Sequence, residues 1–312
     1  MTAPTLSALR FSGVDAARGL AVIGMIAAHV WPRTDQQGEL LVDGRPSMLF
    51  AVVAGIALGI VSGHAETAGV PRADARWRLL IRAGLLIALG LLLWMLPSGI
   101  AIILDYYGLM FVLLLPLLFV PRIALAAVAA LLLVVAPLAR DQLVATGSPV
   151  EQPWVAASDY LLTGYYPALI WLPLLIAGLL CARSDLSSTR TRLLMVTLGT
   201  LASVAGYGAA AVLPNATAEA HSSTVPELLG SGGLAVALVG LALLALDSSA
   251  TPRVLLIAAS PIVAVGRMPL TIYTAHVLVI AAFSPLGPAG QFDAAVGIPL
   301  FIGLTVASAV FA

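Results

Sequence analysis

Lysine is absent from the sequence, and all 15 basic residues are arginine. A Schiff-base mechanism and a lysine general base are therefore excluded. Cysteine is nearly absent as well: Cys181 stands alone, so an internal disulfide, a cysteine metal cluster and a dithiol pair are excluded. Charge of either sign is scarce, since only 10% of the residues are charged and 15 acidic residues balance the arginines. No basic block points to a nucleic-acid partner.

Hydrophobic residues, in contrast, make up 61% of the 312 residues, which does not fit a soluble globule with an ordinary polar surface. We expect an all-α, polytopic integral-membrane helical bundle in the lipid bilayer, with a single domain over residues 1–312. Runs long enough to span a bilayer predict ten transmembrane helices at 14–32, 46–63, 78–97, 101–120, 122–139, 161–182, 192–213, 228–246, 260–283 and 292–311.

The two ends of the chain carry expectations of their own. The apolar run near residue 14 resembles a signal sequence, but no clear small-x-small cleavage site follows it. We therefore expect the first helix to be retained. The chain stops at FIGLTVASAVFA, which is still apolar and has no polar or basic tail. We therefore expect a truncated C-terminus, with a further helix missing.

Arginines are distributed unevenly among the connections between these helices. Most of them lie in the N-terminal segment and in or next to the even-numbered connections, at Arg10, Arg72, Arg76, Arg78, Arg82, Arg122, Arg183, Arg190, Arg192 and Arg253. The third, seventh and ninth connections contain none. By the positive-inside rule, we expect the N-terminus in the cytoplasm and the protein in the inner (cytoplasmic) membrane.

The first predicted helix, GVDAARGLAVIGMIAAHVW, contains an arginine and a histidine separated by ten residues, Arg18 and His29. Eleven positions advance an α-helix by about 1100°, three turns plus roughly 20°, so both side chains share one face about 16 Å apart along the axis. Asp15, three residues before Arg18, shares that face. Ionisable groups inside a membrane segment are costly and usually face a protein interior or a wet cavity. These three residues are therefore the first candidate site.

Each of the three also has a structural interpretation. His29, close to Trp31, fits an aromatic belt at the membrane interface, although imidazole also suits a general base near neutral pH. Arg18 fits the positive-inside rule, with Asp15 as its ion-pair partner one turn earlier. Their occurrence on one face favours the functional interpretation.

The segment VDAARGLAVIGMIAAHV resembles the first helix of the transmembrane acyltransferase superfamily, which includes the acyltransferase-3 proteins and the heparan-α-glucosaminide N-acetyltransferase-like proteins. An arginine, ten residues and a histidine is the pattern associated with acyltransferase-3 members, and Arg18 and His29 match it. Four further segments resemble a bacterial branch of these proteins known mainly as a domain of unknown function. They are GRPSMLFAVVAGIALGI, YYPALIWLPLLIAGLLCAR, HSSTVPELLGSGGLAVALVG and VGRMPLTIYTAHVLVI.

The last of these segments contains Arg267, Thr271, Tyr273 and His276. Arg267 and Thr271 are one turn apart, as are Tyr273 and His276, so each pair is expected on one helix face unless Pro269 bends the helix. A helix that runs outward places Arg267 toward the cytoplasm and His276 toward the outside, as on the first helix. Hydrogen bonding between helices is the alternative interpretation for Thr271 and Tyr273.

The resemblance implies an acyltransferase that moves a short acyl group, such as acetyl, from cytoplasmic acetyl-CoA or another acyl-CoA to an acceptor hydroxyl or amine at the external face. Arg18 and Arg267 would then hold phosphates of the donor, and Asp15 would position Arg18. His29, with His276 as a second catalytic candidate, would act as a base or carry the acyl group. The acceptor would be an envelope glycan, a lipid-linked sugar or a small amine. No metal is expected, because no HExxH or paired-histidine spacing occurs.

Four residues are candidates for substrate binding: Arg45, Asp105 and His221 toward the external side, and Tyr273 within its helix. Arg45 suits an anionic group of the substrate, or snorkels to the interface. Asp105 either orients a histidine or caps its helix. His221, in the loop AEAHSSTVPE, either binds the acceptor or is simply solvated.

Two other classes of function explain part of the sequence. A transporter or permease, with buried arginines and histidines along a solute or proton path, explains the same charges, but no inverted repeat is visible. A non-catalytic membrane scaffold explains the helices and leaves Arg18 and His29 without a role. The oligomeric state stays open, because lipid-facing and partner-facing apolar helices look alike in sequence.

Overall fold

The computed structural model describes residues 10–33, 39–67, 70–146, 154–286, 289 and 291–312, and within these residues the regular structure is all helical. The long helices on the N-terminal side are α1 (Ser12–Val30), α2 (Arg45–Thr67), α3 (Arg72–Trp94), α4 (Leu104–Leu114) and α5 (Arg122–Thr146). They are followed by α6 (Trp154–Ser158), the π-helix η2 (Asp159–Thr163), α7 (Ala168–Ala182), α8 (Thr189–Val212) and α9 (Val225–Leu246). The chain ends with α10 (Arg253–Arg267), α11 (Pro269–Phe283), the short 3-10 helix η3 (Ser284–Leu286) and α12 (Ala294–Phe311).

Seven of the described helices are long and apolar enough to cross a bilayer, and two bent pairs raise the number of spans to as many as nine. The pairs are Trp154–Thr163 with Ala168–Ala182, bent by 42°, and Arg253–Arg267 with Pro269–Phe283, bent by 77°. These elements lie at nine of the ten predicted ranges, so the polytopic helical fold is confirmed. In the one remaining range, 101–120, the helix α4 has only 11 residues. It ends before Pro116, because proline lacks the N–H that a continuing helix needs and its ring clashes with the preceding turn.

Alternate connections gather at two opposite ends of the bundle, as a chain that crosses a membrane repeatedly requires. At one end, the backbone N–H of Ala220 donates to the carboxylate of Glu39 (2.7 Å), which joins the seventh connection to the first. At the other end, the backbone N–H groups of Ser12 and Gly13 donate to the Asp247 carboxylate (2.9 and 2.7 Å). The first and seventh connections therefore share one end, and the start of α1 shares the other with the α9–α10 connection.

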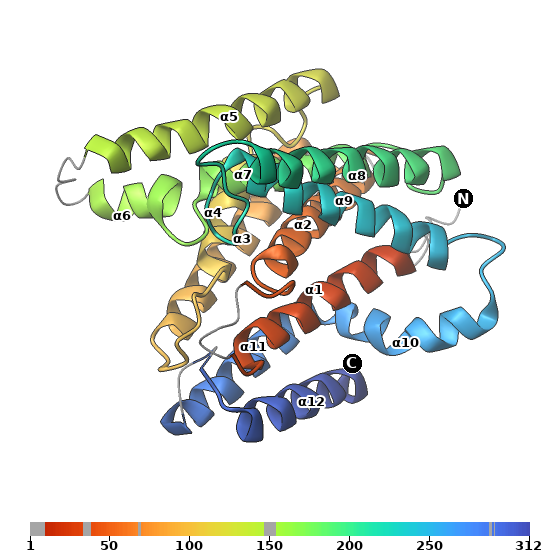
Figure 1. The fold of residues 1–312 in the computed structure, drawn as a ribbon. Coiled ribbons are helices and arrows are strands. Elements are labelled where there is room, and N and C mark those ends of the chain that lie inside the picture. Colours follow the sequence, from red (N-terminus) through yellow and green to blue (C-terminus); the bar gives the residue numbers. More distant parts are fainter. Residues whose placement is uncertain (1–9, 34–38, 68–69, 147–153, 287–288, 290) are drawn as a thin grey trace.

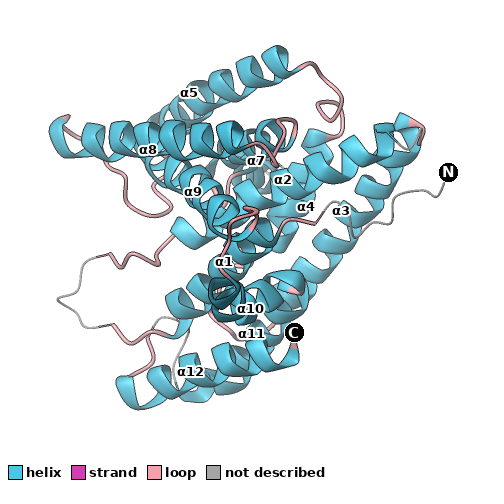
Figure 2. Ribbon diagram, turned by 90° about the vertical axis from the view of Figure 1, so that its right-hand side faces the viewer, coloured by secondary structure: helices cyan, strands magenta, loops and turns pink. Residues whose placement is uncertain are grey.

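Helix α1 runs through the middle of the bundle, where it packs against α2, α9, α10, α11 and α12 (Figure 1). In the side view, α1 lies between a group that contains α5, α8 and α9 and a group that contains α10, α11 and α12 (Figure 2). Glycines allow α10 to approach it: a Cβ at Gly19 would lie 2.0 Å from the Ile262 carbonyl oxygen, and one at Gly266 would lie 1.7 Å from that of Asp15. Small residues at such contacts are typical of membrane helices.

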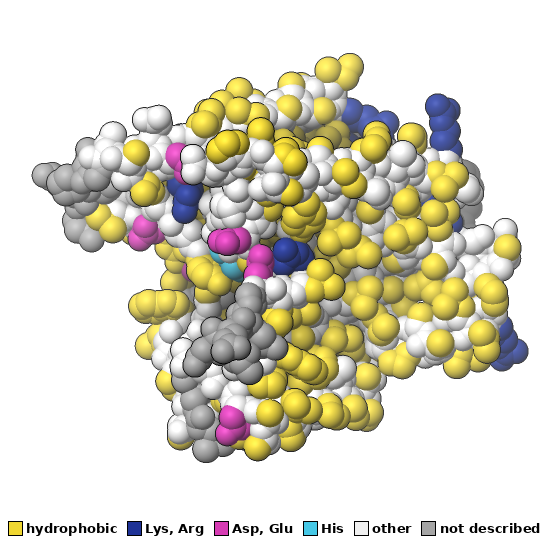
Figure 3. Space-filling model, in the orientation of Figure 1, with side chains coloured by type: hydrophobic (Ala, Val, Ile, Leu, Met, Phe, Trp, Pro, Cys, Tyr) yellow, Lys and Arg dark blue, Asp and Glu magenta, His cyan; other side chains and the backbone are white. Residues whose placement is uncertain are grey.

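The outer surface is largely apolar. Helices α3, α5 and α8 expose leucines such as Leu85, Leu131 and Leu198, and hydrophobic side chains cover most of the face shown in Figure 3. Such a surface is unfavourable in water and is what a lipid environment requires.

The chain breaks at Met268, between α10 and α11. Arg267 ends α10 and Thr271 lies in α11 beyond the 77° bend, so the predicted alternative, a bend at Pro269, is the one that occurs, and the two residues do not share a helix face. Pro269 occupies the first turn of α11, where its missing N–H would have no helical partner anyway. Tyr273 and His276 both lie in α11 with their ring centroids 5.0 Å apart, so their predicted common face is confirmed.

Candidate functional site

Asp15 is the centre of an arginine cluster at the N-terminal end of α1. Arg10 Nε donates to Asp15 Oδ2 (2.7 Å), Arg18 Nη1 donates to Oδ1 (2.9 Å), and Arg267 Nε lies 3.9 Å from Oδ2. Arg18 also donates to the Gly266 carbonyl at the end of α10 (3.1 Å). One buried carboxylate thus faces three guanidinium groups, and the cluster keeps a net positive charge. Asp15 brings Arg18 and Arg267 together. The contact between α1 and the end of α10 is long-range, because 248 positions separate Arg18 from its hydrogen-bond partner Gly266.

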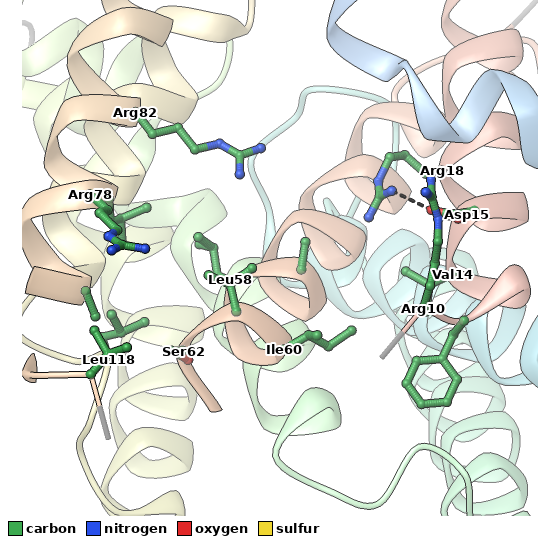
Figure 4. A pocket seen from close by; sticks show the side chains of 16 residues that line it. Arg10, Val14, Asp15, Arg18, Leu58, Ile60, Ser62, Arg78, Arg82 and Leu118 are labelled. Carbon is green, nitrogen blue, oxygen red and sulfur yellow. Dashed lines mark hydrogen bonds and ion pairs between the residues drawn. The ribbon is translucent and has the colours of Figure 1, made fainter. Parts of the chain in front are cut away.

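Two adjoining cavities open beside this cluster, and we call them the arginine cavities. The first, of about 480 Å³, lies between α1, α2 and α3, and Figure 4 shows Arg78 and Arg82 on one side of it opposite Arg10 and Arg18 on the other. The second, of about 310 Å³, shares Arg18 and Arg82 and adds Arg267. Five arginines and one acidic residue therefore line the two cavities together.

From the sequence alone, Arg78 and Arg82 indicate only the orientation of the chain in the membrane. Their spacing of four residues places both on one face of α3, and the structure turns that face toward the first arginine cavity. The sequence signal that could have identified Arg78 and Arg82 as site residues is their spacing, two arginines one turn apart within a spanning helix.

At the other end of α1, His29 meets His276 of α11. His29 Nδ1 lies 3.1 Å from His276 Nε2, and the rings are nearly parallel, with an interplanar angle of 6°. His276 is only 1% exposed. One ring must donate and the other must accept in a single N···N hydrogen bond, so each tautomer determines the other. If His29 donates from Nδ1, its Nε2 carries the lone pair.

A third cavity, of about 710 Å³, opens at this end, and we call it the histidine cavity because His29 lines it. Its charged and polar lining residues are Arg33, Glu39, Asp43, Ser47, Tyr165, Tyr166, Glu219, His221 and Gln291. Three acidic residues and one arginine line it; Asp43 pairs with that arginine, Arg33 (2.6 Å), and Glu39 pairs with Arg45 (2.9 Å), so a small excess of acidic side chains remains, in contrast to the arginine cavities. In Figure 3, acidic side chains, an arginine and a histidine lie close together near the centre of this face, and a few other charged side chains lie elsewhere on it.

His221, which the sequence analysis proposed for acceptor binding, lines the same cavity as His29. Its ring lies against those of Tyr165, Tyr166 and Trp171, with centroid distances of 4.1, 5.2 and 6.1 Å. Burial lowers the pKa of His221 to about 4, because the charged form loses its hydration. The imidazole is therefore neutral at physiological pH.

Glu227 holds the loop that carries His221. Its carboxylate, 1% exposed, accepts hydrogen bonds from the backbone N–H groups of His221 (2.6 Å) and Ser223 (2.7 Å). Both of these residues have a positive φ, 61° and 60°, which residues other than glycine rarely adopt. Glu227 thus supports one wall of the histidine cavity, a role for which its place at the start of α9 gave no signal.

Tyr273 lies between the two ends of the site. It lines the 310 Å³ arginine cavity, and its ring contacts His276, with the ring centroids 5.0 Å apart. Its hydroxyl accepts a hydrogen bond from the backbone N–H of Ile103 (3.4 Å). Tyr273, which is predicted from the sequence to bind the substrate, therefore lies between the arginine cavities and the histidine pair.

Residues 10–208 match the family model described as heparan-alpha-glucosaminide N-acetyltransferase, catalytic. The match covers more than half of the chain. The chain belongs to this family. Comparison with curated proteins gives no match. The part matched by the N-acetyltransferase family model includes Asp15, Arg18 and His29, and it ends before His221 and His276.

In this member of the N-acetyltransferase family, two predicted substrate-binding residues have partners within the protein. Arg45 Nη1 donates to Glu39 (2.9 Å), and its Nε donates to the hydroxyl of Tyr207 (3.1 Å). The Asp105 carboxylate accepts a hydrogen bond from the Tyr160 hydroxyl (2.6 Å). Neither Arg45 nor Asp105 is among the residues that line the histidine cavity, so the structure does not bring them together with His29.

Proposed function

We propose that this protein is an integral-membrane acyltransferase that transfers a short acyl group, such as acetyl, from acyl-CoA to an acceptor hydroxyl or amine. The donor binds in the arginine cavities and the acceptor binds in the histidine cavity. The observation that carries the proposal is the layout along α1, where Arg18 lies beside positively charged cavities and His29 lies beside one with a small excess of acidic side chains. The two residues are about 16 Å apart along the helix axis.

The charge of the arginine cavities supports an anionic donor. CoA carries phosphate groups, and guanidinium groups bind phosphate through charge-assisted, often bidentate hydrogen bonds. Arg18 and Arg10 are fixed by their bonds to Asp15, so the remaining N–H groups of both side chains are held in place. Arg78 and Arg82 supply further positive charge from the opposite wall.

The histidine pair supports proton transfer by His29. When Nδ1 of His29 donates to His276, Nε2 of His29 accepts the proton of the acceptor O–H or N–H. The acceptor atom then attacks the thioester carbonyl carbon, the C–S bond breaks, and the CoA thiolate leaves and takes up a proton. In a two-step alternative, His29 Nε2 attacks the thioester itself and passes the acyl group to the acceptor. His276 serves both sequences because it fixes the tautomer of His29.

The acidic lining of the histidine cavity favours a neutral or cationic acceptor. The name of the family points to the amine of a glucosaminide, and we take an amino sugar, free or in an envelope glycan or lipid-linked sugar, as the first acceptor to test beside small amines. We further propose that the arginine cavities open at the cytoplasmic face and the histidine cavity at the external face of the inner membrane, a proposal that the arginine distribution supports through the positive-inside rule.

The proposal is tested with the purified protein in detergent. Acetyl-CoA is expected to raise the unfolding temperature and, when an amino sugar or a small amine is present as acceptor, to release CoA thiol. His29→Ala is expected to keep the stabilisation and lose the thiol release, because His29 is remote from the arginine cluster. Arg190→Gln, which removes an exposed arginine outside the cavities, is the control and should behave like the wild type.

Two results would contradict the proposal. One is the absence of both stabilisation and thiol release with every short-chain acyl-CoA. The other is solute flux in liposomes that survives His29→Ala, which would support a transporter instead.

A further inference from the structure

Three buried tyrosines form a layer between the arginine cavities and the histidine cavity. Tyr107, Tyr166 and Tyr273 are 2%, 5% and 2% exposed. Tyr107 and Tyr273 line the 310 Å³ arginine cavity, and Tyr166 lines the histidine cavity. The Tyr107 hydroxyl donates to the carbonyl of Ser47 (3.2 Å), and Ser47 lines the histidine cavity. The side chain of Tyr107 therefore reaches from one cavity to the wall of the other.

The rings of Tyr107 and Tyr273 are held in place. Tyr107 bonds to the backbone of α2 at Ser47, and Tyr273 accepts from the backbone of Ile103. Phe50 packs against the Tyr107 ring, with the ring centroids 5.6 Å apart. A ring that swung away would leave a buried polar group without its hydrogen bond. The two rings thus form a fixed wall rather than an adjustable one.

This wall lies next to the reacting groups. The Tyr273 ring contacts His276, which is hydrogen-bonded to His29. His29 lines the histidine cavity and neither arginine cavity, so in the proposed reaction we infer that the thioester carbonyl of the donor reaches His29 along the side of Tyr273. The acyl chain beyond that carbonyl then lies against Tyr273 and Tyr107, while the remainder of the donor extends back toward Arg82, which lines the same cavity.

We propose that Tyr107 and Tyr273 limit the length of the acyl group, so that the enzyme uses acetyl and rejects longer chains. This inference rests on the proposed function and adds the residues that select the acyl group. One methylene in an apolar pocket changes kcat/KM by about 10-fold or more. Two extra methylenes that meet a fixed wall therefore lower kcat/KM for butyryl-CoA by about 100-fold relative to acetyl-CoA.

The experiment measures kcat/KM by CoA-thiol release from acetyl-, propionyl- and butyryl-CoA. Wild type, Tyr107→Ala and Tyr273→Ala are compared. Each alanine variant removes one ring from the wall, so the preference for acetyl over butyryl is expected to fall by about 10-fold or more. The ratio is measured on one protein sample, so it does not depend on how much of a variant is folded.

Two variants serve as matched controls. Tyr107→Phe keeps the ring and loses only the hydroxyl, so it should keep the wild-type ratio. Phe111→Ala enlarges the same cavity one turn further along α4, where Arg82 lies over the ring, 5.9 Å from its centroid. Its position is beside the body of the donor, so it should raise KM for all three donors and leave the ratio unchanged.

The outcomes separate this inference from the proposed function. Wild-type protein that uses butyryl-CoA as well as acetyl-CoA overturns the inference, as do alanine variants that keep the wild-type ratio. In either case, turnover that depends on His29 leaves the proposed function standing. If wild type turns over no acyl-CoA of any length, the proposed function fails and the inference fails with it.

Discussion

The ion pairs of Asp15 allow a quantitative prediction. The side chain of Asp15 is 6% exposed, that of Arg18 is 17% exposed and that of Arg10 is 52% exposed. Removing one partner of a buried pair costs about 3–5 kcal/mol because the other charge stays buried, whereas an exposed pair contributes about 0–1 kcal/mol. Asp15→Asn is therefore expected to lower the free energy of unfolding by about 3 kcal/mol. Arg10→Gln should lower it by no more than about 1 kcal/mol.

A double-mutant cycle with Arg18 tests the cause of this loss. Unfolding free energies would be measured by denaturant titration in detergent for Asp15→Asn, Arg18→Gln and the double variant. Removing both partners leaves no uncompensated buried charge, so the double variant should be more stable than the sum of the single losses predicts. Simple additivity, or an Asp15→Asn protein as stable as the wild type, would refute the reasoning.

Three further predictions concern packing, donor binding and pH. Gly266→Ala should lower the free energy of unfolding by about 1–3 kcal/mol, because its Cβ would lie 1.7 Å from the Asp15 carbonyl oxygen. Gly303→Ala is the control, since a Cβ at Gly303 meets no atom within 4 Å. Equal stability of the two variants would contradict this packing. Arg82→Gln should weaken CoA binding by about 10-fold in a titration at low salt, and an unchanged Kd would remove Arg82 from the donor site. Burial lowers the pKa of His221 from 6.5 to about 4, so the unfolded chain takes up the proton first and stability is lost as pH falls from about 6.5 to about 4. His221→Asn, which tolerates the positive φ, should make that part of the stability–pH curve shallower, and an unchanged slope would show that His221 does not cause it.

The arrangement within one helix could be predicted from the sequence, because helical periodicity alone determines which residues share a face. Arg18 and Asp15 are in contact as that periodicity requires. The contact between His29 and His276 spans 247 residues, and no local pattern specifies which helices become neighbours. The resemblance of its segment to a known signature indicated His276 as a site residue, but it did not indicate that His29 is the partner of His276.

The spans themselves were predictable from long apolar runs, whereas the breaks within them were not. Pro269 indicated a bend, but a proline in a membrane helix is compatible with a mild kink as well as with the 77° break that the structure has. Arg78 and Arg82 were visible in the sequence, yet their part in a cavity depends on α3 lying across from α1. Tertiary packing decides such facts, and the sequence of one helix does not contain them.

We propose that the donor and the acceptor reach the site from opposite sides of the membrane. Proteoliposomes made from a Cys181→Ser, Pro214→Cys protein test this, because a membrane-impermeant maleimide reports the side of the exposed connection between α8 and α9. We predict that acetyl-CoA supports CoA-thiol release only when it is supplied on the side opposite to the labelled cysteine. Release from acetyl-CoA supplied on the same side as that cysteine would contradict the account.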